Sequence, residues 1–283
     1  MPEKIIIFDT TLRDGRQFLR PDISIDDKLE IVQSLDRLGV AVIEVGFVSV
    51  KGDEEVVRRI SQVVENAIVC VIAKSKKEGI EMASAMLKKA KRSRIHIFTP
   101  TNLNPTKKDL GEYQSDMNEG QTLQSIREAV SCARNVSADV EWTALDATRS
   151  RKGFLFKAVE TAISAGATTV NIPDTMGIRL PSEFGELISE IRNQAANVDK
   201  VVLSVHCHNL LGLATANSLE AVRNGARQVE CTINGIGATG GNTSLAQLIG
   251  AIEARRDLFP YHHSLDLDYL PRVSQLVSGS DTH

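Results

Sequence analysis

Short apolar runs alternate with longer amphipathic segments along most of this chain. The apolar runs predict strands over residues 5–9, 42–46, 67–72, 94–98, 139–144, 168–172, 201–206 and 228–233. The amphipathic segments predict helices over residues 25–38, 54–64, 75–90, 119–133, 154–165, 182–194, 214–224 and 244–255. A strand followed each time by a helix is the pattern of βα units that build a parallel sheet.

Eight βα units are the number at which a parallel sheet closes into a barrel. An open doubly wound sheet is the alternative. It is disfavoured because TTLRDG follows the first strand, where a dinucleotide-binding sheet carries GxGxxG. We predict an α/β protein with a single (β/α)8 TIM barrel over residues 1–257, followed by a C-terminal tail over residues 258–283 with a short helix.

Composition and charge narrow the class of protein. The net charge of −3 provides no basic field for nucleic acid or a membrane surface, and 4% aromatic residues disfavour a base-stacking surface. The four cysteines are widely spaced without a CxxC pair, which is typical of reduced thiols. The N-terminus lacks the pattern of a signal peptide, and no apolar run approaches the ~20 residues that span a bilayer. We therefore expect a cytoplasmic location and a small-molecule substrate.

Polar residues at the ends of barrel strands point into the active site of a TIM barrel. The predicted strand ends carry many such residues, namely Asp9, Arg13, Asp14, Arg16, Gln17, Glu44, His96, Thr99, Thr143, Asp146, Arg149, Asn171, Asp174, Thr175, His206, His208, Asn209, Asn234 and Asn242. The candidate chemistry therefore concentrates at one end of the predicted barrel.

His206 and His208 form the sharpest local signal. Alternate residues of a strand face the same side, so both imidazoles can reach one cation. The pair alone is equally well explained by two packed histidines, but Asp14 adds a carboxylate where the first and seventh strands converge near barrel closure. Two nitrogens and one carboxylate suit Mg²⁺, Mn²⁺, Zn²⁺ or Fe²⁺. Arg13 is then either a stabiliser of a developing oxyanion or a structural ion-pair partner.

Several motifs resemble the 2-isopropylmalate synthase and homocitrate synthase family of metal-dependent Claisen enzymes, a group that also contains 3-hydroxy-3-methylglutaryl-CoA lyase. They are FDTTLRDGRQ (8–17), IEVGF (43–47), WTALDATRS (142–150), NIPDTMG (171–177) and SVHCHNLLGLATANSLEAVRNGARQVECTINGIG (204–237). The resemblance implies a barrel that holds Mg²⁺, Mn²⁺ or Zn²⁺ and adds the enolate of an acyl-CoA co-substrate to a 2-oxo acid. It also implies a homodimer.

The resemblance assigns roles to individual residues. Asp14, His206 and His208 match metal ligands, and Asn242 matches an asparagine that ligates or supports the metal. The implied catalytic residues are Arg13, which stabilises the oxyanion, together with Gln17 and Glu44. The implied substrate-binding residues are Thr175, which holds the carboxylate of the 2-oxo acid, and Arg16, His96 and Arg149.

Four positions depart from the family pattern. Arg16 replaces the acid of RDGEQ, Leu145 replaces a glutamate near the base machinery, and Leu210 replaces the acid of HND. Ala238 begins the pair that replaces Glu-Arg in the eighth-strand loop. These changes indicate either an altered substrate, with Arg16 facing an additional anionic group, or a barrel that no longer performs the condensation.

Three functions therefore stay open from the sequence. The first is an acyltransferase like 2-isopropylmalate synthase, and the alternatives are a carbon–carbon lyase or aldolase and a catalytically silent metal- and ligand-binding barrel. Family synthases continue beyond the barrel with a helical subdomain and often a regulatory domain, and this chain stops about where that extension begins. We therefore expect no leucine-type feedback. The length favours lyases, although the eighth-strand loop lacks the cysteine typical of 3-hydroxy-3-methylglutaryl-CoA lyases.

Overall fold

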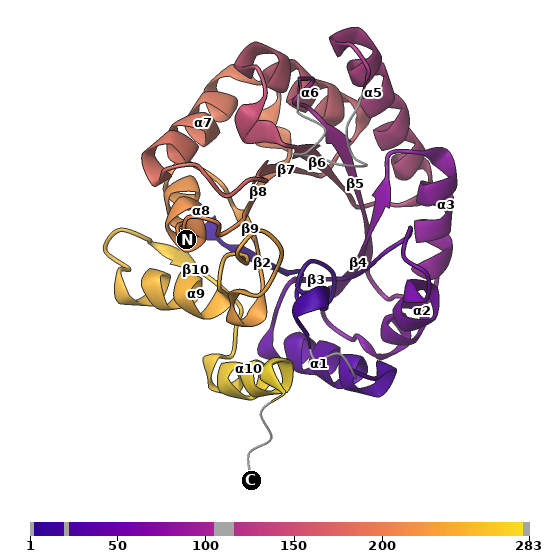
Figure 1. Cartoon of the computed structure of the whole chain (residues 1–283), viewed down its shortest axis with the longest axis vertical. Helices are drawn as coiled ribbons and strands as arrows, with labels where there is room; N and C mark the ends of the chain where they lie inside the picture. Colours follow the sequence, from indigo (N-terminus) through magenta and orange to yellow (C-terminus); the bar gives the residue numbers. More distant parts are fainter. Residues whose placement is uncertain (1–2, 20–22, 105–115, 280–283) are drawn as a thin grey trace.

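Eight parallel strands form a closed barrel in the computed structural model, which describes residues 3–19, 23–104 and 116–279 (Figure 1). The strands follow one another in chain order, and the last pairs with the first. They are β2 (Ile6–Asp9), β3 (Val42–Phe47), β4 (Ile68–Lys74), β5 (Ser93–Pro100), β6 (Val140–Leu145), β7 (Thr169–Asp174), β8 (Val202–Cys207) and β9 (Gln228–Cys231). The predicted (β/α)8 TIM barrel is confirmed.

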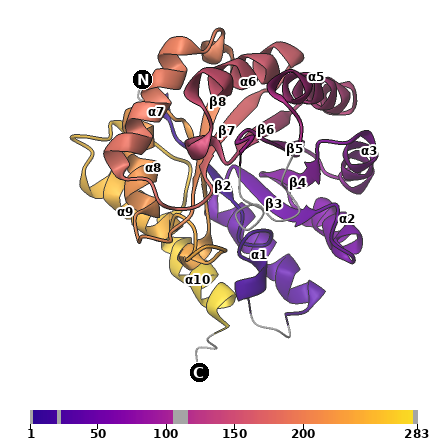
Figure 2. The ribbon, with the colours of Figure 1, turned by 45° about the horizontal axis from the view of Figure 1, so that its top comes forward.

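Helices surround the strands on the outside of the barrel, and Figure 2 shows this ring from a second direction. They are α1 (Ile25–Leu38), α2 (Asp53–Val63), α3 (Lys77–Met86), α5 (Glu119–Val136), α6 (Lys152–Ala165), α7 (Pro181–Gln194), α8 (Ala214–Arg223) and α9 (Leu245–Ala254). All eight predicted helices are present. The third is shorter than predicted and spans Lys77–Met86, while Ser75, the predicted first residue, donates its hydroxyl hydrogen to the carbonyl of Phe98.

Local signals define both ends of the first helix. The Ser24 hydroxyl accepts a hydrogen bond from the Asp27 backbone N–H at 3.0 Å, and the Asp27 carboxylate accepts one from the Ser24 N–H at 2.8 Å. This reciprocal pair satisfies two backbone donors that lack partners within the helix. Gly39 ends the helix with φ of +91°, a left-handed conformation that glycine adopts without a steric penalty.

No helix in the described residues is long and apolar enough to cross a membrane.

The interior of the barrel is layered by the two-residue period of its strands. Towards the N-terminal ends of the strands, Arg94, Glu141, Ser204 and Gln228 form a buried hydrogen-bonded network. Two residues further along the same strands come His96, Thr143, His206 and Glu230. Because alternate side chains of a strand share one face, both layers point into the barrel. The apolar faces of the strands pack instead against the surrounding helices.

A small second sheet lies outside the barrel and was not predicted. β1 (Glu3–Lys4) pairs in parallel with β10 (Tyr261–His262). Strands of two residues are too short for an alternating pattern to reveal them. Beyond them, α10 (Leu270–Ser278) lies beside α1 (Figure 1). The division of the chain at residue 257 stays a prediction, and residues 280–283 of the predicted tail lie outside the described residues.

The turn after β2 presents the first candidate site residues. The carbonyl of Thr10 accepts backbone hydrogen bonds from Arg13, Asp14 and Gly15 at 2.9–3.2 Å. Below this turn, the buried carboxyl of Asp9 accepts hydrogen bonds from the Thr11 N–H and hydroxyl. Burial raises the pKa of Asp9 to about 7, although the hydrogen bonds from Thr11 act in the opposite direction.

This raised pKa predicts a pH-dependent stability. Between about pH 4 and pH 7 the folded chain keeps a proton on Asp9 that the unfolded chain releases, so the free energy of unfolding falls as the pH rises through this window. The asparagine side chain of Asp9→Asn cannot ionise, so this variant does not lose stability in this way. Relative to the wild type, its free energy of unfolding should rise by up to about 4 kcal/mol between pH 4 and pH 8. Urea unfolding at both pH values measures the difference.

The exposed Asp199→Asn variant is the matched control, and its unfolding free energy should follow that of the wild type. Equal pH dependence in Asp9→Asn and wild type would contradict this prediction.

Candidate metal centre

A cavity of about 510 Å³ opens at the C-terminal ends of the barrel strands. Its polar lining consists of Arg13, Asp14, Arg16, Gln17, His96, Thr143, Asn171, Thr175, His206, His208 and Glu230. Its apolar lining consists of Phe47, Ile72, Phe98, Leu145, Pro173 and Ala238. The structure therefore brings most of the residues predicted from the sequence to one cavity.

Three potential metal ligands converge in this cavity. One ligand atom from each of Asp14, His206 and His208 lies within 4.8 Å of the other two. Nε2 of His208 is 3.4 Å from Oδ2 of Asp14, and the two imidazole rings are 4.7 Å apart between centroids. Two strand-end histidines and one loop carboxylate thus form a set of nitrogen and oxygen donors that suits a divalent cation.

Hydrogen bonds fix the orientation of both imidazoles. Nδ1 of His206 lies 2.8 Å from a carboxylate oxygen of Glu230, and Nδ1 of His208 lies 2.6 Å from the carbonyl oxygen of Thr175. A carbonyl oxygen or carboxylate accepts hydrogen bonds, so we assign the hydrogen to Nδ1 in each ring. The Nε2 atoms are then left to bind a cation, which is the usual arrangement behind metal-bound histidines.

Asp14 is held in its ionised form. Burial opposes ionisation, but the charge of Arg13 and the neighbouring histidines outweighs burial and holds the pKa of Asp14 well below its usual range. For His208, burial favours the neutral form, but the hydrogen bond and charge of Asp14 outweigh burial and raise the pKa. A divalent cation held by Asp14 and His208 would take over this stabilisation of the carboxylate.

Asn242 supplies a further oxygen donor beside the cluster. Its Nδ2 lies 2.6 Å from Oδ2 of Asp14, and its Oδ1 is buried without a hydrogen-bond partner among the residues that the structure describes. At Gly237, an added Cβ would lie 1.8 Å from the Asn242 amide nitrogen and 3.0 Å from Oδ2 of Asp14. A glycine is therefore required for this close approach. The unpartnered amide oxygen and the donor set together fit a divalent metal.

A chain of hydrogen bonds positions Arg13 beside the cluster. Its Nε donates to Glu44 and its Nη1 donates to Asp14 at 2.9 Å. Glu44 also contacts Nδ1 of His96 at 2.7 Å, and Nε2 of His96 contacts the Thr143 hydroxyl at 2.6 Å. Burial opposes ionisation of Glu44, but Arg13 and His96 outweigh it and lower its pKa to about 2. Glu44 therefore stays charged and anchors Arg13 from below the cavity lining.

The remaining candidates occupy different places. Arg16 lines the cavity, and its Nη1 donates to Asp53 at 3.0 Å, while Gln17 lines the same region. Arg149 does not belong to the lining of this cavity, and its guanidinium donates to the Asp146 carboxylate at 2.7 and 2.9 Å. The structure thus separates Arg149 from the other predicted substrate-binding residues.

The four positions that depart from the family pattern do not all reach the cavity. Arg16, Leu145 and Ala238 line it, whereas the side chain of Leu210 lies outside and is 53% exposed. A cation and two apolar side chains therefore border the space beside the predicted metal ligands. The replacement at Leu210 changes the outer surface of a loop instead.

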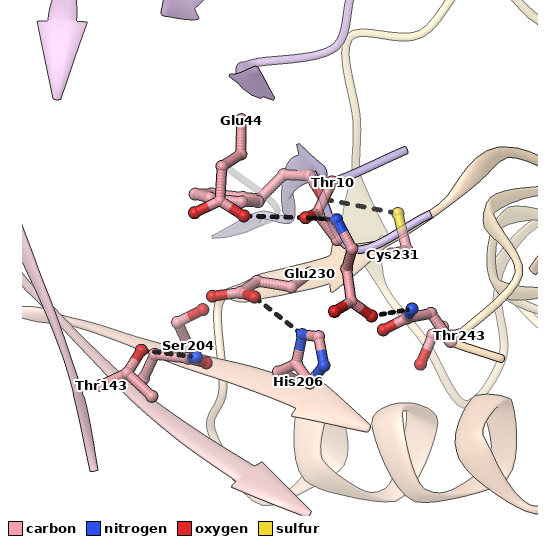
Figure 3. A network of polar contacts seen from close by, with 12 residues as sticks. Thr10, Glu44, Thr143, Ser204, His206, Glu230, Cys231 and Thr243 are labelled. Atoms are coloured by element: carbon pink, nitrogen blue, oxygen red, sulfur yellow. Dashed lines mark hydrogen bonds and ion pairs between the residues drawn. The ribbon is translucent and has the colours of Figure 1, made fainter. Parts of the chain in front are cut away.

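Glu230 is a site residue that the sequence reasoning missed. It is 1% exposed, contacts His206 through Oε2, and leaves Oε1 without a hydrogen-bond partner among the described residues. Figure 3 shows its carboxylate directed towards His206. A signal was present, because Gln228 and Glu230 are polar residues spaced by two in a predicted apolar strand.

The chain is thus of the class of parallel (β/α)8 barrels that carry, at their C-terminal strand ends, a two-histidine, one-carboxylate cluster suited to a divalent cation. Within this class the chain belongs to the HMGL-like family, whose model matches residues 4–277.

The chain is similar to curated 2-isopropylmalate synthases and to a solved HMG-CoA lyase. The chain is 50% identical over 260 residues to the 2-isopropylmalate synthase of Aquifex aeolicus, covering 92% of this chain and 49% of that protein. It is 46% identical over 279 residues to the 2-isopropylmalate synthase of Haemophilus influenzae, covering 98% and 53%. The chain spans about half the length of the curated relatives it matches. A solved HMG-CoA lyase from Acinetobacter baumannii, in complex with coenzyme A and 3-methylmalate, matches the fold with a TM-score of 0.79 at 21% identity. The match covers 99% of this chain and 92% of the lyase chain.

The contact between Glu230 and His206 generates a prediction about metal affinity. Glu230→Ala removes the acceptor that orients the imidazole, so the dissociation constant for Mn²⁺ should rise about 10- to 100-fold, with a smaller rise for Glu230→Gln. Titration calorimetry on metal-free protein measures this constant.

Glu253→Ala is the matched control, because Glu253 pairs with His263 at 3.0 Å outside the cavity lining. Its Mn²⁺ affinity should match that of the wild type. An unchanged affinity in Glu230→Ala would show that the carboxylate does not support the metal ligand.

Proposed function

We propose that this chain is the catalytic barrel of a divalent-metal-dependent acyltransferase that condenses an acyl-CoA with a 2-oxo acid, as a 2-isopropylmalate synthase does. The convergence of Asp14, His206 and His208 within 4.8 Å, beside a fixed Arg13, carries this proposal. The identity of 46–50% to proteins named 2-isopropylmalate synthase supports it. Mg²⁺, Mn²⁺ and Zn²⁺ are the candidate ions.

The proposed reaction forms one carbon–carbon bond. The carbon next to the thioester carbonyl loses a proton and bonds to the keto carbon of the 2-oxo acid, and the keto oxygen gains a proton. Water then cleaves the thioester and releases coenzyme A with a free thiol. When bound at Asp14, His206 and His208, the cation supplies Lewis acidity to the keto group.

The residues of the chain supply binding and charge stabilisation. The Arg13 guanidinium is held by Glu44 and Asp14, so it can stabilise negative charge on the keto oxygen without first having to reorient. The Thr175 hydroxyl lies in the cavity lining and is assigned to the carboxylate of the 2-oxo acid. Phe47 and Phe98, whose rings are 6.1 Å apart between centroids, limit water on the apolar side.

A second candidate function is a barrel that binds a metal and a 2-oxo acid without turnover. The observation that favours it is Leu145, because this side chain lines the cavity at the end of β6 and offers no proton acceptor. Carbon–carbon cleavage of a preformed adduct is the reverse chemistry at the same residues. The catalytic unit at residues 1–257, the cytoplasmic location and the homodimer stay predictions.

The proposal predicts that His206→Ala abolishes turnover while the barrel stays folded. The variant loses one metal ligand, so release of the coenzyme A thiol from acetyl-CoA should fall at least about 100-fold. The assay uses a panel that contains pyruvate and 3-methyl-2-oxobutanoate, with each candidate metal and with a chelator. Circular dichroism measures folding.

His263→Ala is the control, since His263 lies outside the cavity lining. Full activity in His206→Ala would refute the metal-dependent mechanism. Tight binding of a 2-oxo acid by the wild type, without thiol release for any pair, would favour the silent barrel or cleavage of an adduct.

Arg16 generates a prediction about substrate charge. Asp53 accepts a hydrogen bond from one edge of the guanidinium at 3.0 Å, and Asp53 itself accepts one from the Phe47 N–H at 2.9 Å. Among the described residues no partner binds the other edge of Arg16, so that edge can meet an anion. We expect Arg16→Gln to raise the KM of an acid with a second anionic group, such as 2-oxoglutarate, about tenfold relative to that of pyruvate.

Arg59→Gln is the matched control, because Arg59 forms a comparable ion pair with Asp26 on the exposed surface. An Arg16→Gln variant with unchanged KM for every acid would remove Arg16 from the substrate-binding set.

A further inference from the structure

Asp146 has an unusual backbone conformation at the edge of the candidate site. It follows β6 directly, is fully buried, and has φ of 63° and ψ of 36°. For an L-residue with a side chain, this left-handed conformation costs about 1–2 kcal/mol. Such a conformation persists only where the surrounding contacts hold it in place.

The side chain of Asp146 provides those contacts. Arg149 donates from Nε to Oδ1 at 2.9 Å and from Nη2 to Oδ2 at 2.7 Å. Asn102 donates from Nδ2 to Oδ2 at 2.7 Å, and the Ser150 hydroxyl donates to the Asp146 carbonyl at 3.0 Å. A paired arginine–carboxylate bond of this kind is strong and directional. The carboxylate is therefore anchored from two strand-end loops.

The left-handed conformation aims the Asp146 N–H at the cavity lining. This N–H donates to the hydroxyl oxygen of Thr175 at 3.0 Å. A hydroxyl that accepts a hydrogen bond still has its own hydrogen to donate. No protein acceptor for that hydrogen occurs within residues 3–19, 23–104 and 116–279, and Thr175 lines the cavity. Its carbonyl also accepts from His208, so the same residue touches the metal centre.

We propose that Asp146 is a positioning residue, which orients the Thr175 hydroxyl so that its hydrogen is donated to the carboxylate of a 2-oxo acid. Arg149, which is not part of the cavity lining, then acts on the substrate through Asp146. This inference rests on the proposed function, because it takes a 2-oxo acid as the ligand of the cavity.

A purely structural role of Asp146 would lead to a different experimental result. If the contact between Arg149 and Asp146 only stabilised the turn after β6, removing the carboxylate would lower the stability of the fold and leave the affinity for 2-oxo acids unchanged. The two roles are therefore separated by binding measurements combined with a change at Thr175.

The central variant is Asp146→Gly. Glycine adopts the left-handed conformation without strain and keeps the N–H, but it loses the anchoring carboxylate. Calorimetry with pyruvate and 3-methyl-2-oxobutanoate, in saturating Mn²⁺, should give dissociation constants about fivefold higher for Asp146→Gly and about tenfold higher for Thr175→Val. Thr175→Ser keeps the hydroxyl and should differ from wild type by less than about threefold. The Mn²⁺ affinity should be unchanged throughout.

The double variant decides the mechanism. If Asp146 acts through the Thr175 hydroxyl, Asp146→Gly should have no further effect in the Thr175→Val background. Asn197→Gly is the matched control, because Asn197 also has φ of 63° but precedes β8 at the opposite end of the barrel. Asp146→Asn, which tolerates the same conformation and keeps an acceptor oxygen, should restore most of the affinity if the glycine variant unfolds.

Each outcome has a distinct meaning. Equal weakening by Asp146→Gly in both backgrounds, or unchanged binding by that variant, overturns this inference while the proposed function stands. A wild-type protein that binds Mn²⁺ but neither acid overturns both. Loss of affinity that depends on the Thr175 hydroxyl supports the positioning role.

Discussion

Hydrogen bonding between β2 and β9 is the constraint on which the site depends. Ile6 to Asp9 pair with Gln228 to Cys231, more than two hundred residues further along the chain. This pairing closes the barrel and brings the turn after β2 next to the loops that follow β8 and β9. Asp14 thereby meets His208 and Asn242. The cluster could not form in an open sheet, in which the first and last strands lie apart.

Closure also creates an interior in which polar groups need partners. Buried polar atoms without hydrogen bonds are costly, so the interior layers of this barrel are joined by side-chain contacts across strands. In the layer around Arg94, the guanidinium donates hydrogen bonds to Glu141 and Gln228, and its Nε forms an ion pair with Asp139 at 3.0 Å. In the part of the chain that the structure describes, the layer above it leaves Oε1 of Glu230 without a hydrogen-bond partner, Oδ1 of Asn242 beside it also lacks one, and both residues lie next to the candidate metal ligands. The lower layer therefore pairs its buried cation with carboxylates, whereas the free oxygens beside the cluster suit a ligand.

The side chains at the centre of the site are held in place by hydrogen bonds, whereas several residues that line its edge differ from the family pattern. The orientations of His206, His208 and Arg13 are each set by a hydrogen bond from behind, which is the arrangement that metal binding and charge stabilisation require. At the edges, Arg16, Leu145 and Ala238 replace residues typical of the family. The centre of the cavity therefore holds the donor atoms and the arginine on which the proposed function depends, while its walls indicate a different substrate or a different use.

Much of the fold and part of the site followed from the sequence alone. The periods of two and 3.6 residues located the eight strands and eight helices, and the period of two also placed His206 and His208 on one face. Only the tertiary structure decided that Glu230 supports His206, that Glu44 anchors Arg13 below the cavity lining, and that Arg149 binds Asp146 away from it. The physical reason is that local periodicity determines which face a side chain occupies. Its partner is set by register and loop geometry across distant strands.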